Sequence, residues 1–304
     1  SMGSKKSGFN RRSTAEQVTE GLDLSGKTAL ITGVNSGLGY ESMRVLSARG
    51  AHIIGAARTL EKATEACAGI AGGTTPVACE LSDFDSVVAC AETVRGLDRP
   101  IDILMCNAGI MALPKLEQKY GLELQFVTNH LGHYILIRQL LDSVIEAPAG
   151  RVVLLSSAAH TTTRRGGIEF DNLSGESGYS GWSFYGQSKL ANLLTARSLA
   201  GRLRSTNATA NALHPGVIET NLGRHMSGPL TGLIRVFSPL FERSIEQGAA
   251  TQCYVAAHPQ VEGVSVEYFA DSNIARPSRY ARDHKLAERL WQVSEELVAD
   301  YLPD

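Results

Sequence analysis

Residues 32–39 read Thr-Gly-Val-Asn-Ser-Gly-Leu-Gly, with a short, largely apolar run at 28–31 before them and apolar residues at helical spacing after them. This arrangement predicts a turn that leads from a strand into a helix. At such a turn, free backbone N–H groups and the positive end of the helix dipole bind the pyrophosphate of a dinucleotide. Gly33 permits the tight turn, Gly37 lets a phosphate approach the backbone, and Gly39 lets the helix pack on the strand.

The spacing of these glycines is G-x-x-x-G-x-G, which differs from the G-x-G-x-x-G of the commonest dinucleotide fingerprint. Glycine-rich turns also occur without a ligand, so the flanking strand and helix carry the prediction of a nucleotide site. The residues that we expect to form it are Gly33, Asn35, Ser36, Gly37, Leu38 and Gly39.

Strand-like and helix-like segments alternate along the rest of the chain. Strands are expected at residues 27–31, 51–57, 76–79, 101–106, 151–156, 208–213 and 264–269, and helices at 60–70, 83–97, 121–145, 182–204, 245–257 and 285–298. Apolar strands that alternate with helices predict a parallel sheet with helices on both faces. The expected fold class is α/β, a single doubly wound Rossmann domain with a seven-stranded, mostly parallel sheet. We expect it to span residues 25–304, after a polar extension at 1–24 and with a substrate lid inserted near 221–243.

Composition narrows the class of protein. The chain has 304 residues, of which 43% are hydrophobic and 20% charged, as in ordinary globular domains. A net charge of −2 argues against a nucleic-acid partner. The five cysteines form no C-x-x-C pair, so we interpret them as reduced core residues and expect a cytoplasmic location. No run of about 18 apolar residues is present, so no transmembrane segment is expected.

The end of the second strand indicates which nucleotide binds. Enzymes that use NAD place an acidic residue there to hydrogen-bond the ribose 2′-hydroxyl. This strand instead ends in Ala57 followed by Arg58. A guanidinium pairs with a 2′-phosphate and stacks on adenine, so the sequence favours NADP(H) over NAD(H). The alternative is that Arg58 is a solvated surface residue.

A candidate catalytic group follows the fifth strand. Ser157 lies directly after that strand, and Tyr185 and Lys189 are four residues apart on the next long helix, so their side chains share a face. A nearby ammonium favours the phenolate and lowers the pKa of a tyrosine, which suits a proton donor in hydride transfer. Ser157 can hold the carbonyl oxygen by a hydrogen bond. Because a Tyr-x-x-x-Lys spacing also arises by chance on solvated helices, its meaning depends on the glycine turn and Ser157.

With these motifs in order, the chain resembles the short-chain dehydrogenase/reductase family over nearly all of residues 25–300. The resemblance rests on Thr32, Gly33, Gly37, Gly39, Asn107, Ala108, Gly109, Asn129, Ser157, Tyr185, Lys189, Pro215 and Gly216. Retinol-dehydrogenase-like and WW-domain-oxidoreductase-like members are the most similar. The segments Asn129-His130-Leu131-Gly132-His133 and Ser156-Ser157-Ala158-Ala159-His160 carry that finer likeness.

The resemblance implies a role for each member of the catalytic group. Tyr185 would be the general acid/base, and Ser157 would donate a hydrogen bond to the carbonyl oxygen. Lys189 would bind the hydroxyls of the nicotinamide ribose and tune Tyr185. Asn129 would hold a water that relays protons to Lys189.

The resemblance also implies further contacts with the coenzyme. Asn107, with Ala108 and Gly109, would brace the central strands beside it. The loop from Pro215 and Gly216 to Thr220 would contact the nicotinamide, with Ile218 and Thr220 as partners. Glu80 and Leu81 stand where the family usually has Asp-Leu near the adenine, which leaves that contact open.

The activity implied is an NADP(H)-dependent oxidoreductase, without a metal, that interconverts a hydrophobic ketone or aldehyde and the corresponding alcohol. Relatives often pair through the helices that begin near residues 121 and 182, so a homo-oligomer is expected. The alternative is a non-catalytic protein that senses NADP(H) or acts as a scaffold on the same fold. The presence of all four catalytic residues favours the enzyme.

Four histidines lie near these motifs. His130 and His133 are three residues apart on an expected helix and suggest a metal site. No third ligand lies nearby in the sequence, so we interpret them as packing residues. His160 and His214 flank the proposed site, where either could touch the substrate or serve the structure.

Overall fold

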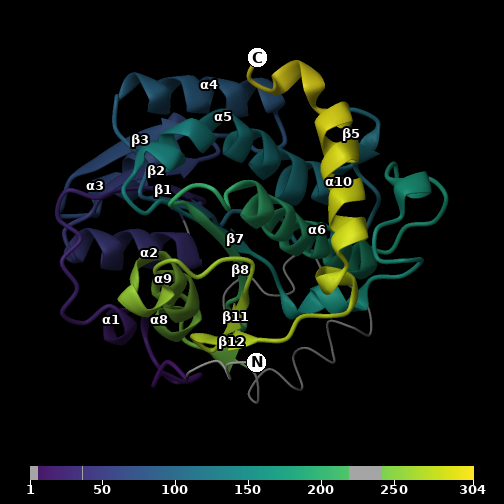
Figure 1. The fold of residues 1–304 in the computed structure, drawn as a ribbon. Coiled ribbons are helices and arrows are strands. Elements are labelled where there is room, and N and C mark those ends of the chain that lie inside the picture. Colours follow the sequence, from purple (N-terminus) through teal and green to yellow (C-terminus); the bar gives the residue numbers. More distant parts are fainter. Residues whose placement is uncertain (1–5, 36, 219–241) are drawn as a thin grey trace.

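The computed structural model describes residues 6–35, 37–218 and 242–304, and in these ranges the central feature is an eight-stranded sheet (Figure 1). The strand order is β12-β11-β8-β7-β4-β1-β2-β3. Every neighbouring pair is parallel except β11 and β12 at one edge. The bounds are β1 Thr28–Thr32, β2 His52–Ala57, β3 Thr74–Ala78, β4 Ile103–Cys106, β7 Arg151–Leu155, β8 Thr209–His214, β11 Tyr268–Ala270 and β12 Asn273–Ala275. The expected doubly wound α/β fold is confirmed, with one strand more than the seven expected.

The additional strand is β12, which forms a hairpin with β11. Asp271 and Ser272 connect the two strands and have φ values of 54° and 58°. Positive φ at two successive residues is typical of a type I′ turn, which Asn-Gly or Asp-Gly usually signals in a sequence. Because this turn is Asp-Ser, it gave no clear signal. The strand expected at 264–269 also begins later, at Tyr268.

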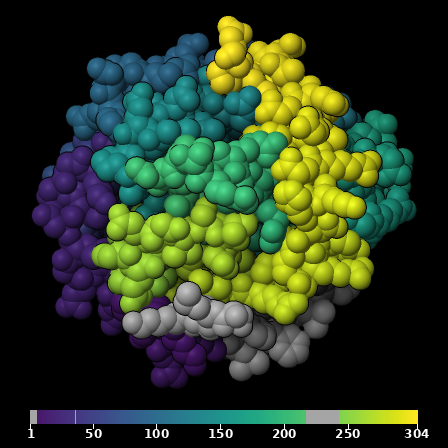
Figure 2. All heavy atoms as spheres, viewed as in Figure 1, coloured from purple at the N-terminus to yellow at the C-terminus, as the bar shows by residue number. Residues whose placement is uncertain are grey.

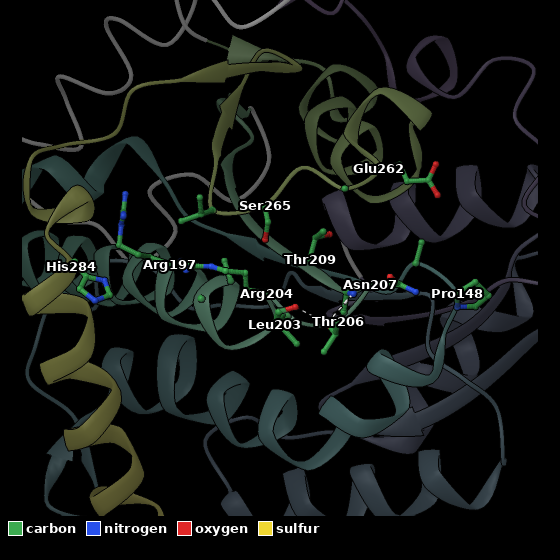
Figure 3. A pocket seen from close by; sticks show the side chains of 16 residues that line it. Pro148, Arg197, Leu203, Arg204, Thr206, Asn207, Thr209, Glu262, Ser265 and His284 are labelled. Carbon is green, nitrogen blue, oxygen red and sulfur yellow. Dashed lines mark hydrogen bonds between the residues drawn. The ribbon is translucent and has the colours of Figure 1, made fainter. Parts of the chain in front are cut away.

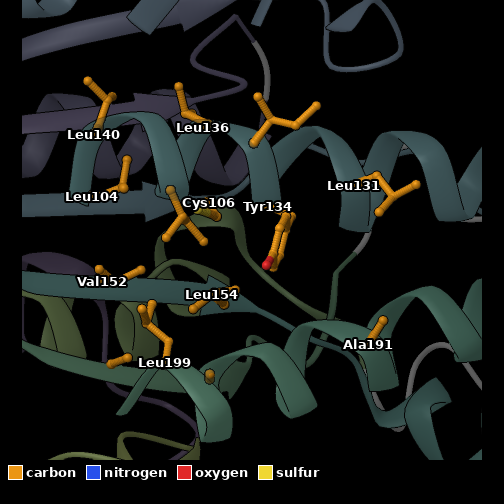
Figure 4. Close-up of a cluster of buried hydrophobic side chains, with 14 of the residues drawn as sticks. Leu104, Cys106, Leu131, Tyr134, Leu136, Leu140, Val152, Leu154, Ala191 and Leu199 are labelled. Atoms are coloured by element: carbon orange, nitrogen blue, oxygen red, sulfur yellow. The ribbon is translucent and has the colours of Figure 1, made fainter. Parts of the chain in front are cut away.

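Helices cover both faces of the sheet (Figure 1). One face carries α2 Gly37–Ala48, α3 Leu60–Ala68 and α9 Ala250–Ala257, and the other carries α4 Phe84–Gly96, α5 Gly132–Glu146 and α6 Gly181–Arg202. Strand β4 shows how the sheet contributes to both cores. Leu104 and Cys106 face the α5 side (Figure 4), whereas Ile103 and Met105 face the α2 side. This alternation follows from the two-residue period of a strand.

The helix expected at 121–145 starts later and begins irregularly. The short strands β5 Gln118–Lys119 and β6 Leu122–Glu123 pair as a hairpin before it. A π-helical turn, η1 Phe126–Leu131, then leads into α5. π-Helical turns are frequent at functional sites, and this one contains Asn129.

The N-terminal segment 6–24 packs against the α2–α9 face. Its helix α1 Ala15–Val18 is capped by Thr14 and buries Ala15 and Val18. The ring of Phe9 meets the ring of Tyr254 edge-on at 5.9 Å. The division of the chain into an extension and a domain after residue 24 stays a prediction.

The C-terminal helix α10 His284–Leu297 lies across α6 and contacts α5 (Figures 1 and 2). Trp291 packs edge-on against Tyr134 at 5.0 Å, and the Arg202 guanidinium lies 4.1 Å from the indole centroid. Glu295 accepts hydrogen bonds from Tyr134 at 2.6 Å and Arg138 at 2.5 Å. The outer faces of α5 and α6 are therefore partly occupied by the chain's own C-terminus.

Most of the predicted lid at 221–243 lies outside the described residues. At its edges, β9 Val217–Ile218 and β10 Glu242–Arg243 pair in parallel, so the two ends of this interval lie side by side. The helix expected at 245–257 is divided into α8 Ile245–Gly248 and α9. In the described ranges, no helix has both the length and the apolar character needed to cross a bilayer.

Candidate active site

The carboxyl ends of β1, β4, β7 and β8 surround a cavity of about 290 Å³. Ligands of doubly wound sheets bind at this edge. The predicted site residues on its wall are Leu38, Asn107, Gly109, Ser157, Tyr185, Lys189, Pro215 and Gly216. Ile110, Met111, Ala158 and Ala159 also line it and were not predicted, because residues after a strand end carry no periodic signal; His214, expected to flank the site, lines it too.

A larger cavity of about 560 Å³ lies at the other end of the sheet (Figure 3). Arg204, Thr209 and Glu262 border it, near the amino ends of β7 and β8. It holds none of the predicted site residues. The smaller cavity is the better candidate because it joins the glycine turn to the catalytic group.

The glycine turn has the geometry that the sequence predicts. Gly33 and Gly37 have positive φ values of 74° and 49°. A Cβ on Gly39 would overlap the Gly33 carbonyl oxygen and lie 2.6 Å from Asn107 Nδ2. Asn35 lies on the turn, and Ser36 lies outside the described residues. This close approach of helix and strand agrees with the packing role expected of Gly39, and such packing is typical of turns that bind a pyrophosphate.

Asn107 joins the glycine turn to the neighbouring strand. Its Nδ2 donates a hydrogen bond to the Thr32 carbonyl at 2.9 Å, and its Oδ1 accepts one from Gln252 at 3.1 Å. The backbone N–H groups of Asn107 and Ala108 both donate to Thr32 Oγ1 at 3.0 Å. The ends of β1 and β4 are thereby fixed beside each other.

Asn129 is held by hydrogen bonds within the protein. Its Nδ2 donates to the Ile110 carbonyl and to Ser188 Oγ, both at 2.9 Å, and its Oδ1 accepts from the Ile110 N–H at 2.8 Å. A Cβ on Gly109 would lie 3.0 Å from Asn129 Oδ1 and 3.4 Å from Lys189 Nζ. Asn129 therefore lies next to the catalytic group, and its water-holding role stays a prediction.

Ser157, Tyr185 and Lys189 meet where α6 passes the end of β7. Ser157 follows β7, and its Oγ accepts a hydrogen bond from the Ala159 N–H at 3.1 Å. Lys189 Nζ lies 5.8 Å from the centroid of the Tyr185 ring and 3.4 Å from the Leu155 carbonyl oxygen, to which it donates. Both Tyr185 and Lys189 are buried.

The pKa of Tyr185 departs from the expectation that Lys189 lowers it. Burial raises this pKa to about 12, and a hydrogen bond with Ser157 opposes the rise only in part. Burial also lowers the pKa of Lys189 to about 8. Desolvation of the phenolate is thus the largest effect on the Tyr185 pKa, and it favours the neutral phenol.

Arg58 is 70% exposed at the end of β2 and forms an ion pair with Glu80, with 2.6 Å between Nε and Oε2. Burial of Glu80 opposes ionisation, but hydrogen bonds from Arg58 and Ser82 outweigh it and lower the pKa of Glu80. Leu81 is buried beside Gly132, where a Cβ would overlap the Leu81 carbonyl oxygen. Arg58 and Glu80 were predicted as two separate contacts with the coenzyme, but in the structure they form one ion pair.

The loop after β8 lies at the mouth of the cavity. Gly216 has a φ of 98°, and the Pro215 carbonyl accepts a hydrogen bond from Arg243 at 3.4 Å. The backbone of Ile218 belongs to β9. The Ile218 side chain and all of Thr220 lie outside the described residues, so their predicted contacts with the nicotinamide stay predictions.

The two histidines of the π-helical turn and α5 bind polar partners in the core. His130 Nε2 lies 2.9 Å from Ser294 Oγ, and His133 Nε2 lies 2.8 Å from Thr32 Oγ1. Across the described ranges, no cluster of three His, Cys, Asp or Glu residues is arranged to hold a metal ion.

A doubly wound sheet with a glycine turn at its first crossover defines a dinucleotide-binding α/β protein. The family model of the short chain dehydrogenases matches residues 27–228. The chain belongs to the short-chain dehydrogenase family.

Individual relatives refine this assignment. The chain is 43% identical to short-chain dehydrogenase TIC 32 B, chloroplastic, of Brassica napus, over 98% of this chain and 96% of that protein. It is 41% identical to retinol dehydrogenase 12 of Mus musculus, over 92% and 89%. A solved structure of an uncharacterized protein from Mycobacterium Paratuberculosis superposes with a TM-score of 0.76 at 33% identity, covering 94% of this chain and 98% of that one. The resemblance to retinol-dehydrogenase-like members is confirmed.

Proposed function

We propose that the chain is an NADP(H)-dependent oxidoreductase that interconverts a hydrophobic ketone or aldehyde and the corresponding alcohol, with Tyr185 as the general acid/base. The observation that carries this proposal is the convergence of Ser157, Tyr185 and Lys189 on one wall of the cavity that the glycine turn also borders. Ile110, Met111 and Trp182 give the same cavity an apolar lining, which supports a hydrophobic substrate.

The residues present fit a nicotinamide coenzyme, because Gly33 and Gly37 have the positive φ values of a tight strand-to-helix turn, Gly39 lets α2 pack closely on that turn, and Leu38 of the first turn of α2 lines the cavity. Support for NADP(H) comes from Arg58, which uses only Nε for Glu80 and keeps its two terminal nitrogens for a 2′-phosphate. When bound, the coenzyme would supply or accept the hydride.

Three side chains of the protein would bind the carbonyl oxygen and transfer the proton. Ser157 Oγ would hold the carbonyl oxygen, and Tyr185 would donate its proton to that oxygen as the alcohol forms. With a pKa of about 12, the phenol is protonated at neutral pH and is ready for the reduction. Lys189, with a pKa of about 8, is mostly an ammonium at neutral pH and stabilises the phenolate that remains.

The test is oxidation of NADPH by the chain with a panel of hydrophobic aldehydes and ketones. Replacing Tyr185 with phenylalanine removes the proton donor, so we expect kcat to fall by about 100- to 10,000-fold. The affinity for NADPH, measured by calorimetry, should change little. A Y185F variant that works about as fast as the parent would disprove the role of Tyr185.

The alternative function has its own outcome in the same assay. If the parent chain binds NADPH tightly yet reduces no member of the panel, the non-catalytic sensor or scaffold becomes the better proposal. A homo-oligomer and a cytoplasmic location also stay proposals. All five cysteines are free and buried, which supports a reducing compartment.

A further inference from the structure

Two histidine rings contact the two ends of one peptide bond, the bond between Ser157 and Ala158. His160 Nδ1 lies 2.7 Å from the Ser157 carbonyl oxygen, and the Ala158 N–H donates to His214 Nδ1 at 3.2 Å. We propose that His160 and His214 are positioning residues that hold Ser157 at the reacting carbonyl, as neutral rings in opposite tautomers. This inference rests on the proposed function of Ser157.

The partners of His160 determine its tautomer. The Ser278 N–H donates a hydrogen bond to His160 Nε2 at 3.0 Å. A backbone N–H is only a donor, so Nε2 carries no proton. The proton therefore resides on Nδ1, which donates to the Ser157 carbonyl. His160 thus connects the end of β7 to the segment that leads into α10.

The same reasoning gives His214 the other tautomer. Its Nδ1 accepts from two backbone N–H groups, those of Ala158 at 3.2 Å and Gly216 at 3.3 Å. Nδ1 therefore carries no proton, and Nε2 does. His214 links the peptide after Ser157 to the Pro215-Gly216 turn, where the nicotinamide is proposed to lie.

The surroundings of both rings favour the neutral form. Burial lowers the pKa of His160, which also packs edge-on against Tyr268 at 5.4 Å, while its hydrogen bond to the Ser157 carbonyl opposes the shift. Burial lowers the pKa of His214 to about 4, aided by the charge of Arg243 and opposed by Asp271, and a proton on His160 would lower it further. Protonation of either ring would place a proton on the nitrogen that now accepts a hydrogen bond. That nitrogen would then face a backbone N–H donor, and the hydrogen bond would be lost.

Holding the peptide fixes the direction of the serine hydroxyl. Ser157 is extended, with φ −158° and ψ 156°, and its Oγ already accepts from the Ala159 N–H. A rotation of the peptide that follows Ser157 would change both ψ and the position of the Ala159 N–H. The hydroxyl would then lose its alignment with Tyr185 without any change in the catalytic residues themselves.

His160 offers the cleaner mutational test, because His214 also contacts the proposed nicotinamide loop. In His160→Asn the amide N–H can occupy the place of Nδ1–H and donate to the Ser157 carbonyl, whereas His160→Leu has similar bulk and no donor. We expect kcat to fall at least tenfold in H160L and to recover to within about threefold of the parent in H160N. The Kd for NADPH should stay within about twofold in both. A kcat for H160L within twofold of the parent overturns the proposal, and so does an equal loss in H160N and H160L.

Nitrogen-15 NMR of the imidazole rings tests the tautomers without any activity. The spectra distinguish protonated from unprotonated ring nitrogens, and the signals are assigned by their loss in H160N and His214→Asn. At neutral pH we expect the proton on Nδ1 of His160 and on Nε2 of His214. Equal tautomers, or a charged ring, overturn the proposal even if the enzyme is active. Conversely, opposite tautomers in a chain whose Ser157→Ala variant keeps full activity would refute the proposed function of Ser157 and leave the tautomer assignment intact.

Discussion

At the scale of single residues, the proposed 2′-phosphate of NADP(H) would compete with Glu80 for Arg58. In the chain alone its Nε is bound to Glu80 at 2.6 Å, and it is mostly exposed. An exposed ion pair of this kind contributes little to stability. This small contribution to stability agrees with the proposal that Arg58 binds the 2′-phosphate. The carboxylate of Glu80 would repel that phosphate and so oppose its binding.

Replacing Arg58 with alanine should shift the preference between the two coenzymes. A hydrogen bond to a charged group contributes about 1.5–3 kcal/mol, so kcat/KM with NADPH should fall by about 10- to 100-fold. The value for NADH should stay within about twofold, because NADH has no 2′-phosphate. Steady-state kinetics with each coenzyme at a fixed concentration of one aldehyde measure both values.

Glu80→Gln is the matched control for this prediction. It keeps the size of the side chain and removes the charge that faces the phosphate, so kcat/KM with NADPH should stay equal or rise. An R58A variant that uses NADPH as well as the parent would contradict the NADP(H) proposal.

At the scale of elements, α6 is the part that aligns the catalytic group. It passes so close to the 3₁₀ turn after β7, Ala158–Thr162, that a Cβ on Gly186 would overlap the Ala159 carbonyl oxygen. Gly186 directly follows Tyr185. The absence of a side chain at 186 therefore sets the distance between Tyr185 and the end of β7.

Gly186→Ala should destabilise the protein although alanine is the better helix former. Overpacking against a backbone carbonyl costs about 1–3 kcal/mol, which exceeds the roughly 1 kcal/mol gained in helix propensity. We expect a lower free energy of unfolding in urea and a lower kcat, because α6 must move away from Ser157.

Gly201→Ala is a control on the same helix. A Cβ there meets no atom within 4 Å, so the substitution should leave kcat unchanged and raise stability by up to about 1 kcal/mol. If G186A behaved like G201A, the close approach of α6 to the 3₁₀ turn would not matter for catalysis.

Elements also mark the limit of what the sequence could predict. The parallel strands and long helices were predictable because apolar periodicity persists over many residues, and glycines such as Gly39 have a local steric reason. The hairpin between β11 and β12 was not predicted because its Asp271-Ser272 turn lacks glycine.

The raised pKa of Tyr185 was not predicted either. The spacing of Tyr185 and Lys189 can be read from the local sequence, but the burial of Tyr185 depends on elements that are distant in the sequence. The pairing of Arg58 with Glu80 required the register of β2 on β3.

At the scale of the whole molecule, buried histidines tie stability to pH. Burial lowers the pKa of His130 to about 3 and of His133 and His214 to about 4. At pH values between these folded-state pKa values and the pKa of about 6.5 of a histidine in the unfolded chain, the unfolded chain binds more protons than the folded one. The free energy of unfolding therefore decreases as the pH falls. Glu123 acts in the opposite sense, because burial raises its pKa to about 7.

Three histidines outweigh one glutamate, so acidification from pH 7 to pH 5.5 should lower the free energy of unfolding. Each group contributes up to about 1.4 kcal/mol per pH unit, which leaves a net loss of the order of 2–4 kcal/mol over this interval. Urea unfolding followed by circular dichroism at several pH values measures it. An unchanged or rising stability below pH 6.5 would show that these rings are not held neutral in the fold.

The position of α10 bears on the expected pairing of two chains. The family resemblance implies pairing through the helices that correspond to α5 and α6, but here Trp291 and Glu295 of α10 contact those helices. A dimer formed through this face would include α10 in its interface or would require it to move away. Light scattering of the full chain, compared with a W291A variant, tests whether α10 limits association.

The parallel pairing of β9 with β10 has a practical consequence. It brings together the two points where the interval 219–241 leaves and rejoins the described chain. An interval anchored at adjacent points can differ in length and composition without disturbing the sheet. Because the substrate lid predicted from the sequence falls in this interval, we expect that grafting the corresponding stretch of a relative between Ile218 and Glu242 exchanges substrate preference while the glycine turn is left as it is.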